Sequence, residues 1–469
     1  MPETPSRCAL LACLALATVL RTSVAAQPSP PNVIVVLVDT LRADRLGVYG
    51  NRSGLTPYLD ELARRGTVFS NAYASSSWTC PSVASLFTSR YPSQHQVTTL
   101  DARISDSEVT LAERLQQARY RGLGFVANLR LTEQLGYGQG FERWNSYLSA
   151  TKLRADRLRR RLLSSPQLGA APGAQAPLFL YVHYMEPHAP YNMPPRYRKK
   201  FERRSDPSID SAAAAQKLLD LNFGALSAAE LDHLTSLYDA EVAFLDDELR
   251  RLMAGLEARG LLQHSIVVVT ADHGEELGEH QLVGHGVSLY NQELHVPLIV
   301  VGRGVPAGQV VREPVSLMDV APSLLALIGQ PAEPRFEGRS LVPLLQGGTA
   351  PVDIVAELFQ ASTTFDARRH SSAIVRGNHK LLTIAGNWRT VADAEMYDLA
   401  ADPAETKPVG YVGGPRQLAA GTPELALAED LVRALQQTET RLASSATPQE
   451  RAPVDEKMRE RLRGLGYAN

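Results

Sequence analysis

Four polar residues in three segments of the chain are of types suited to covalent and metal-ion chemistry. Thr79 lies two residues before a proline, in Ser77-Trp78-Thr79-Cys80-Pro81-Ser82, and its hydroxyl is a potential nucleophile. Asp39 ends one apolar run, and Asp272 and His273 follow another. Two carboxylates and an imidazole are suitable ligands for a divalent metal ion, which could activate a nearby hydroxyl.

Two apolar segments are expected to position these residues. Residues 33–38 precede Asp39, and residues 266–270 precede Asp272. Runs of five or six mostly β-branched residues predict strands buried on both faces, as in a parallel sheet. Ligands of open α/β sheets gather outside the carboxyl ends of the strands. We therefore expect Asp39, Asp272 and His273 to meet at one sheet edge.

A series of motifs extends from about Pro31 to the C-terminus. They are residues 31–42, 56–63, 85–92, 187–191, 272–275, 296–299 and 396–399, followed by Asp402-Pro403 and Glu405-Thr406. Their order and spacing resemble the sulfatase family of the alkaline phosphatase superfamily. The resemblance implies an α/β, alkaline-phosphatase-like sandwich with a large, mostly parallel sheet flanked by helices. It also implies a smaller C-terminal α+β subdomain.

The sequence departs from the sulfatase pattern at the nucleophile. The family's C-x-P-x-R motif supplies a cysteine that becomes formylglycine, but here Thr79 occupies that position and Cys80 comes one residue too late. Val83 stands in place of the arginine, and Asn128 stands in place of a basic pocket residue. The chain is thus more similar to the threonine-using branches of the superfamily, which act on phosphodiesters or transfer phospho-groups.

A threonine nucleophile also bears on the choice between sulfate and phosphate. Hydrated formylglycine expels sulfate by collapsing to an aldehyde, whereas a threonine ester has no such route. A phospho-threonine can instead be released by an in-line water or alcohol. Thr79 therefore favours phosphorus esters without excluding sulfate.

The resemblance implies a metal site formed by Asp39, Asp272 and His273 together with Thr79. Three oxygens and one nitrogen favour Ca²⁺, Mg²⁺ or Mn²⁺, with Zn²⁺ as an alternative because of the imidazole. A two-metal site would need about three further Asp or His ligands. No second cluster is evident in the sequence, so we predict one divalent ion.

Further site residues follow from the matched motifs. His183, His188 and His285 are candidates for acid–base catalysis, because imidazole titrates near neutral pH. A lone histidine is equally compatible with a structural role, which we assign to His95, His264 and His280. Substrate contacts are expected from two further residues, Asn128 and Arg42.

Composition and charge limit the function classes. The 469 residues are 44% hydrophobic, enough for a large domain and a smaller one, and the net charge of −2 gives no reason to expect a nucleic-acid partner. Solvated helix faces explain the arginine-rich stretches 157–161 and 198–204. We predict a catalytic domain at 27–345 and a C-terminal subdomain at 346–469, with a small antiparallel sheet and terminal helices.

The N-terminus has the pattern of a secretory signal. Arg7 precedes an apolar stretch at 8–20, and Ala26 ends a small-residue cleavage site. Thirteen residues are too few to span a bilayer, which needs about 20. A lipoprotein signal ending at Cys13 is the weaker alternative. We expect a mature secreted or periplasmic bacterial protein that starts near residue 27, without a transmembrane segment, and retains only Cys80.

Short apolar segments alternate with helical ones along the chain. Strands are predicted at 33–39, 124–128, 178–184, 265–270 and 297–302, with a hairpin at 373–376 and 379–383. Helices are predicted at 57–65, after Ser82, at 227–259, at 424–444 and at 454–464. Residues 164–177 are expected to form a loop. Residues 192–222 are either a lid or a surface excursion, and Asp239, Asp246 and Asp247 are expected to cap helices or face solvent.

Three functions are compatible with this pattern. The first is an exported metal-dependent hydrolase that cleaves sulfate or phosphate esters, of diester or phosphonate type, through a covalent Thr79 intermediate. The second transfers a phospho-group to a lipid or glycan alcohol. The third is a degenerate protein that binds an anionic glycan. The substrate would be a small-molecule, glycan or lipid ester, and no motif specifies an oligomeric state.

Overall fold

The computed structural model describes residues 29–147, 152–168, 176–202, 226–359, 370–383, 394–412 and 418–453. From Pro31 onward these residues belong to one compact unit, which is the one described below. The predicted signal peptide and the predicted helix at 454–464 lie outside the described residues. The predicted domain boundary at residue 345 stays a prediction.

A large sheet forms the centre of this unit. Within the described residues it has eight strands in the spatial order β13 (Gln309–Val311), β2 (Thr67–Phe69), β12 (Leu298–Gly302), β8 (Ser265–Ala271), β1 (Asn32–Val38), β7 (Leu178–Tyr184), β5 (Arg121–Val126) and β6 (Arg143–Ser146). Only β12 runs antiparallel to its neighbours β2 and β8. The mostly parallel α/β sheet predicted from the sequence is therefore confirmed.

The central strands bring the predicted site residues to one edge. β1 pairs in parallel with β8, with Val38 opposite Ala271, and with β7, with Leu37 opposite His183. Asp39 and Asp272 thus leave adjacent strands at the same level. The strands are buried on both faces, which explains their unbroken apolar sequences.

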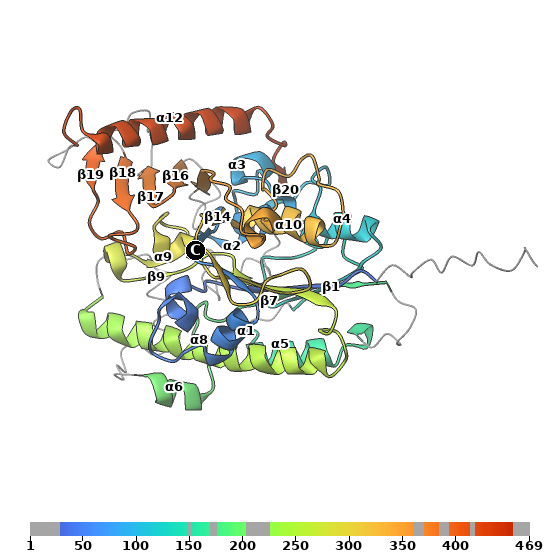
Figure 1. Cartoon of the computed structure of the whole chain (residues 1–469). Helices are drawn as coiled ribbons and strands as arrows, with labels where there is room; N and C mark the ends of the chain where they lie inside the picture. The colour runs from blue at the N-terminus through green and yellow to red at the C-terminus, as the bar shows by residue number, and fades with distance from the viewer. Residues whose placement is uncertain are drawn as a thin grey trace, which may run out of the picture. The chain divides into compact units, whose positions relative to one another are not determined.

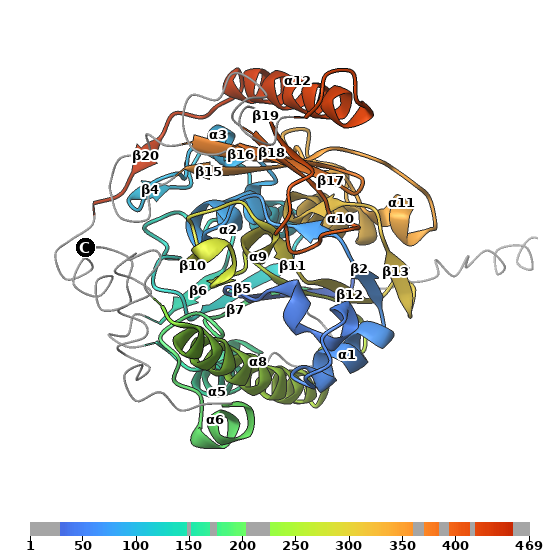
Figure 2. The same cartoon turned by 90° about the vertical axis from the view of Figure 1, so that its left-hand side faces the viewer.

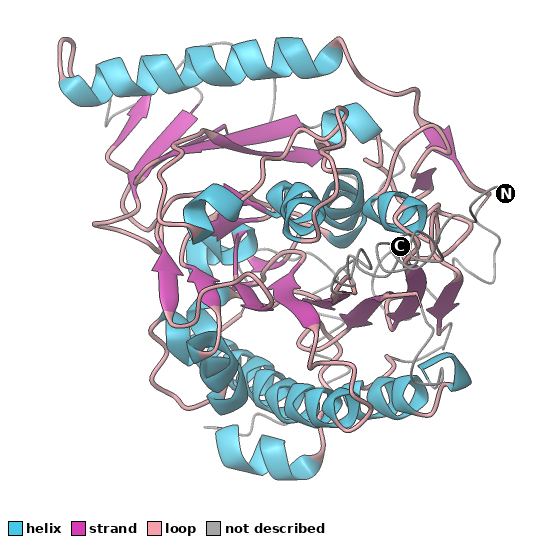
Figure 3. Cartoon of the chain, turned by 45° about the vertical axis from the view of Figure 1, so that its right-hand side comes forward, coloured by secondary structure: helices cyan, strands magenta, loops and turns pink. Residues whose placement is uncertain are grey.

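Helices cover both faces of the sheet (Figures 1 and 3). On one face lie α1 (Pro57–Arg64), α5 (Ala155–Leu163) and the long α8 (Ala228–Glu257), with α6 (Pro195–Phe201) packed outside α8. On the other face lie α2 (Thr79–Thr88), α4 (Leu111–Gln117) and α10 (Val320–Leu327). Three further α-helices have four residues each: α3 (Pro92–His95), α9 (Asn291–Leu294) and α11 (Val342–Leu345).

A second, antiparallel sheet follows the central one in sequence (Figure 2). Its order is β15 (Ile354–Phe359), β16 (His370–Arg376), β17 (His379–Thr383), β18 (Ala394–Asp398) and β19 (Gly410–Val412), and α12 (Pro423–Ala443) packs along it. The predicted hairpin is confirmed, because Arg376 pairs with His379 across a turn in which Gly377 has φ +57°. Small ribbons join β3 (Ala72–Tyr73) to β11 (His295–Val296) and β14 (Val315–Ser316), β9 (Glu276–Leu277) to β10 (Val283–Gly284), and β4 (Ala102–Arg103) to β20 (Glu450–Arg451).

Two boundaries differ from the sequence-based expectation. α2 begins at Thr79 rather than after Ser82, because Pro81 lies in the first helical turn, where backbone N–H groups have no intrahelical acceptor to lose. β5 runs from Arg121 to Val126, not 124–128. The start of the strand was not predicted because Gly122 and Gly124 interrupt its apolar pattern. Gly124 is needed for packing, since a Cβ there would lie 2.3 Å from the Trp144 ring.

Asp246 confirms the capping role expected of the α8 carboxylates. Its two oxygens accept hydrogen bonds from the backbone N–H groups of Tyr58 (2.9 Å) and Leu59 (2.8 Å), at the start of α1. Asp246→Ala is expected to lower the free energy of unfolding by about 1–2 kcal/mol in urea denaturation, since both donors lose their acceptor. Asp247→Ala, whose ion pairs to Arg250 and Arg251 are half-exposed, should cost less. Equal losses would contradict this assignment.

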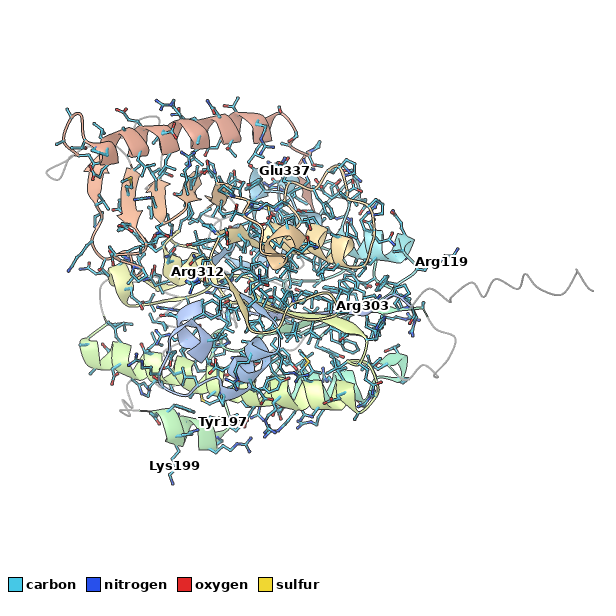
Figure 4. All side chains as sticks on the ribbon, in the orientation of Figure 1. Arg119, Tyr197, Lys199, Arg303, Arg312 and Glu337 are labelled. Atoms are coloured by element: carbon cyan, nitrogen blue, oxygen red, sulfur yellow. The ribbon has the colours of Figure 1, made fainter. Side chains whose placement is uncertain are left out.

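The described part of the predicted lid contains α6, and residues 203–225 lie outside the described residues. The basic side chains of α6 face outward, as Lys199 does in Figure 4, and Arg198 pairs with Glu202 at 3.0 Å. A solvated helix face therefore accounts for this basic stretch. Among the described residues, no helix has the length and apolar character needed to cross a membrane.

Candidate active site

Thr79 occupies the first position of helix α2 and is buried. The N-terminus of a helix has free backbone N–H groups and a positive dipole end, which favour an anion there. The Thr79 hydroxyl oxygen lies 3.3 Å from His273 Nε2. The Ser82 hydroxyl, one turn further, donates to the Asp272 carbonyl at 2.6 Å and ties the helix to the strand that carries the acidic residue.

Asp272 has one satisfied and one free carboxylate oxygen. Its Oδ1 accepts hydrogen bonds from the backbone N–H groups of Thr40 (3.2 Å) and His273 (3.0 Å). Thr40 has φ +57°, a left-handed conformation that turns its N–H toward this oxygen. Asp272 Oδ2 is buried without a hydrogen-bond partner.

Asp39 has the same asymmetry. The Asn128 amide donates to Asp39 Oδ2 at 2.6 Å, and His183 Nε2 lies 3.1 Å from the same atom. Asp39 Oδ1 is buried and has no hydrogen-bond partner among the described residues. The two free oxygens lie around one ring nitrogen, because His273 Nε2 is 3.9 Å from Asp39 Oδ1 and 3.5 Å from Asp272 Oδ2.

The pKa shifts of the two aspartates test whether these residues suit a cation. Burial raises the pKa of Asp39 to about 7, and burial together with the neighbouring Asp39 raises the pKa of Asp272 to about 8. A cation among the free oxygens would hold both carboxylates ionised and satisfy them. The residues present therefore fit a divalent metal ion.

His273 has the tautomer that a metal ligand needs. Its Nδ1 lies 2.9 Å from the Gly274 carbonyl oxygen, which can only accept a hydrogen bond, so Nδ1 carries the proton and Nε2 is a free lone pair. Gly274 allows this tight turn, since a Cβ there would lie 2.0 Å from the Gln292 carbonyl oxygen. The predicted ligands Asp39, Asp272, His273 and Thr79 are thus brought together.

A second arrangement uses the same carboxylates with a different imidazole. Asp39, His183 and Asp272 each offer one ligand atom, and these atoms lie within 4.8 Å of one another. His183, however, already contacts Asp39 Oδ2 with one ring nitrogen and the Tyr181 hydroxyl with the other (3.0 Å). The set with His273 leaves fewer existing contacts to break, so we favour it.

The predicted histidines His188 and His285 form a cluster of imidazole rings with His273, in tilted and edge-on arrangements. The His285 ring lies 4.6 Å from the His273 ring and 4.9 Å from the His188 ring, measured between centroids. Burial opposes protonation of His285, but the Glu275 carboxylate, 3.0 Å from its Nδ1, raises the pKa of His285 to about 9. Burial lowers the pKa of His188 well below its usual value. Two neighbouring imidazoles with pKa values shifted in opposite directions therefore lie side by side.

The sequence analysis expected Arg42 to contact substrate, but its guanidinium is engaged by groups of the protein. Its guanidinium donates twice to the Asp44 carboxylate, at 2.8 and 2.9 Å, and once to the Glu275 carbonyl at 3.0 Å. It also lies 2.9 Å from a Glu279 carboxylate oxygen. Arg42 therefore holds the segment that carries Glu275, and we assign it a positioning role instead.

Two buried lysines hold segments next to the site histidines. The sequence analysis did not identify either of them. Lys152 donates to the His188 carbonyl at 2.7 Å and lies 3.4 Å from Glu241. Lys380, from the C-terminal sheet, pairs with Glu405 at 2.8 Å and donates to Asn291 Oδ1 at 3.0 Å. Only Glu405 had a sequence signal, because it lies in a matched motif.

Glu293 fixes the loop that carries His285. Its carboxylate accepts hydrogen bonds from the backbone N–H groups of Gly286 (2.6 Å) and Ser288 (2.9 Å), and from the Ser288 hydroxyl. The Gly286 N–H also reaches the Ser77 carbonyl at 2.9 Å, which joins this loop to the nucleophile segment.

The fold and the site bring the hydroxyl of Thr79, at a helix start, next to a pair of buried carboxylates at the edge of a mostly parallel sheet. The chain belongs to the sulfatase family, whose pattern matches residues 31–330. A second pattern, described as N-sulphoglucosamine sulphohydrolase, C-terminal, matches residues 278–418. The protein is therefore a hydrolase that acts on sulfuric or phosphoric esters.

Named relatives are distant but match most of the chain. Arylsulfatase K of Bos taurus is 24% identical over 82% of this chain and 79% of its own length. A sulfatase of Formosa agariphila is 25% identical over 80% of this chain and 82% of its own length.

Solved structures share the fold. One, a complex with its substrate D-glucosamine-2-N,6-O-disulfate, superposes with a TM-score of 0.70 at 20% identity over 89% of this chain and 99% of the other. The phosphonate monoester hydrolase of Agrobacterium radiobacter gives a TM-score of 0.69 at 20% identity over 91% and 98% of the two chains.

Proposed function

We propose that this protein is an exported, metal-dependent hydrolase that cleaves phosphodiester- or phosphonate-type esters through a covalent Thr79 intermediate. The observation that carries the proposal is the placement of the Thr79 hydroxyl, 3.3 Å from His273 Nε2 at the start of α2, beside two free carboxylate oxygens. A cysteine-derived nucleophile has no counterpart here, since Cys80 lies one residue further along the helix.

Each group has a defined task in this reaction. A bound divalent ion would lower the pKa of the Thr79 hydroxyl and balance the charge on the ester oxygens. Thr79 Oγ1, ionised after giving its proton to solvent, attacks phosphorus, the bond to the leaving oxygen breaks, and that oxygen takes a proton from the His188–His285 pair. Water then attacks phosphorus and returns a proton to the histidine pair, while the bond from phosphorus to Oγ1 breaks and Thr79 leaves in its ionised form. Asn128 holds Asp39 during both steps.

The charges around the site favour substrates with a single negative charge. Asp39, Asp272 and Glu275 contribute carboxylates, whereas Asn128 occupies the place of a basic residue and Val83 is packed in the core. A phosphodiester or phosphonate monoester carries one charge, whereas a phosphate monoester carries two near neutral pH. The second charge would need compensation that this pocket does not offer.

Initial rates on four aryl esters test the proposal. We expect kcat/KM to be higher on a bis-aryl phosphate and an aryl phosphonate monoester than on an aryl phosphate or aryl sulfate. The difference reflects stabilisation of charge in the transition state. An aryl sulfate hydrolysed faster than every phosphorus ester would instead identify a true sulfatase with an unusual nucleophile.

Export is supported by the N-terminal sequence pattern, with a charged start, an apolar stretch and small residues before Gln27. Among the relatives, a putative extracellular sulfatase of Caenorhabditis elegans is 24% identical over 69% of this chain. Fractionation of the producing cells, with N-terminal sequencing of the mature chain, would locate the protein and its cleavage site.

A further inference from the structure

A chain of three buried side chains leads from the aromatic core to Asp39 Oδ2, the carboxylate oxygen that already accepts hydrogen bonds. The Tyr181 hydroxyl lies 3.0 Å from His183 Nδ1, and His183 Nε2 lies 3.1 Å from Asp39 Oδ2. Tyr181 and His183 alternate along β7, and Asp39 follows the adjacent β1. All three residues are fully buried, so water does not compete for these hydrogen bonds.

The chemistry of the end groups assigns each proton in this chain. An ionised Asp39 carboxylate only accepts hydrogen bonds, so the proton between it and His183 belongs to Nε2. Because a buried imidazole is disfavoured as a cation, Nδ1 then carries no proton. The Tyr181 hydroxyl must therefore donate to Nδ1. His183 is held in the Nε2–H tautomer, whereas His273 is held in the Nδ1–H tautomer by the Gly274 carbonyl.

The Tyr181 hydroxyl is placed by a rigid environment. Its ring stacks on Trp144 at a centroid distance of 5.6 Å with 13° between the planes, and meets Phe87 edge-on at 5.0 Å. Phe141 completes the cage, with ring centroids 6.3 Å apart. Such packing leaves the phenol little rotational freedom.

We propose that Tyr181 and His183 are positioning residues that hold Asp39 Oδ2, so that Asp39 Oδ1 faces the divalent cation. This inference rests on the proposed metal site and changes the role of His183 from acid–base catalyst to orienting donor. The Asn128 amide, at 2.6 Å, is the second donor to Oδ2. With that oxygen occupied twice, only Oδ1 remains for the metal ion.

Calorimetric titration of metal-depleted protein with Mg²⁺, Ca²⁺ and Mn²⁺ measures the effect directly. His183→Leu is expected to weaken cation affinity about 10- to 100-fold, the usual cost of losing a hydrogen bond behind a ligand. His183→Gln, whose amide nitrogen can donate to Asp39 in place of Nε2, should stay within a few-fold of the parent protein. Tyr181→Phe should fall between them.

Tyr184→Phe is the matched control. Tyr184 is equally buried on the same strand, and its hydroxyl has no hydrogen-bond partner. Its removal should leave cation affinity unchanged. If His183→Gln weakens binding as much as His183→Leu does, His183 is itself a ligand and the inference is wrong. Equal affinity of Tyr181→Phe and the parent protein would also overturn it.

Nitrogen NMR of protein carrying ¹⁵N-labelled histidine reports the tautomer without depending on activity. We expect His183 Nε2 to be protonated and Nδ1 unprotonated in the Mg²⁺-loaded protein, with the signals assigned from the His183→Gln spectrum. An unprotonated His183 Nε2 in the loaded protein would contradict the proposal. A parent protein that binds none of the three cations would refute the proposed metal site itself, which is a separate outcome.

Discussion

The Thr79→Ala protein is expected to fold normally and to lose about three or more orders of magnitude in kcat. The nucleophile is removed, whereas the other residues of the site still bind and orient the substrate. Trp78, not Thr79, precedes the first turn of α2, so the substitution removes no helix cap. Steady-state kinetics on the preferred aryl ester measures the loss, and urea denaturation checks the fold.

Two substitutions serve as controls for the nucleophile. Thr79→Ser retains a hydroxyl and should retain part of the activity. Cys80→Ala should retain most of it, because the proposed reaction gives the Cys80 thiol no role and the substitution keeps the backbone carbonyl to which Tyr137 donates. Rapid quenching and mass spectrometry should place a phospho-group on Thr79. An inactive Cys80→Ala protein, or an aldehyde found at Cys80, would show that the nucleophile has been misassigned.

Removal of divalent cations by chelation is expected to abolish turnover, and about one equivalent of metal ion per chain should restore it. Without the ion, two buried carboxylates face each other and the Thr79 hydroxyl keeps its proton. Elemental analysis of the active protein, followed by reconstitution with Ca²⁺, Mg²⁺, Mn²⁺ or Zn²⁺, measures the stoichiometry and the preferred ion.

Substitutions of buried aspartates separate metal binding from stability. Asp39→Asn and Asp272→Asn should each lower metal content and rate together. Asp246→Asn changes an equally buried aspartate on α8 that caps α1. This variant should therefore retain the metal content and the rate of the parent protein. About two ions per chain would refute the one-metal site. Full metal occupancy in Asp39→Ala would place the ion elsewhere.

The sequence predicted the architecture because the burial of a strand is visible in the hydrophobicity of its own consecutive residues. The runs that became β1, β7 and β8 are apolar without alternation, which only strands buried on both faces require. The register then brought Asp39 and Asp272 to one edge, as the rule for parallel sheets implies. The start of α2 was missed because a proline in the first turn resembles a helix boundary.

Partners distant in sequence decided the roles of individual side chains. Arg42 resembled a substrate contact, but Glu275 and Glu279, more than two hundred residues away, occupy its guanidinium together with Asp44. Lys380 has no local signal, yet it joins the C-terminal sheet to the segment before Glu293. Such pairings depend on how elements pack, which spacing along the chain does not encode.

The sequence by itself determined which residue types could meet at the sheet edge: a hydroxyl nucleophile, two carboxylates and several histidines. Only the tertiary structure distinguished the histidines from one another. The Gly274 carbonyl leaves His273 Nε2 free for a metal ion, and Tyr181 with Asp39 engages both nitrogens of His183. An imidazole takes its role from the groups that face its two nitrogens, and these groups come from other strands and loops.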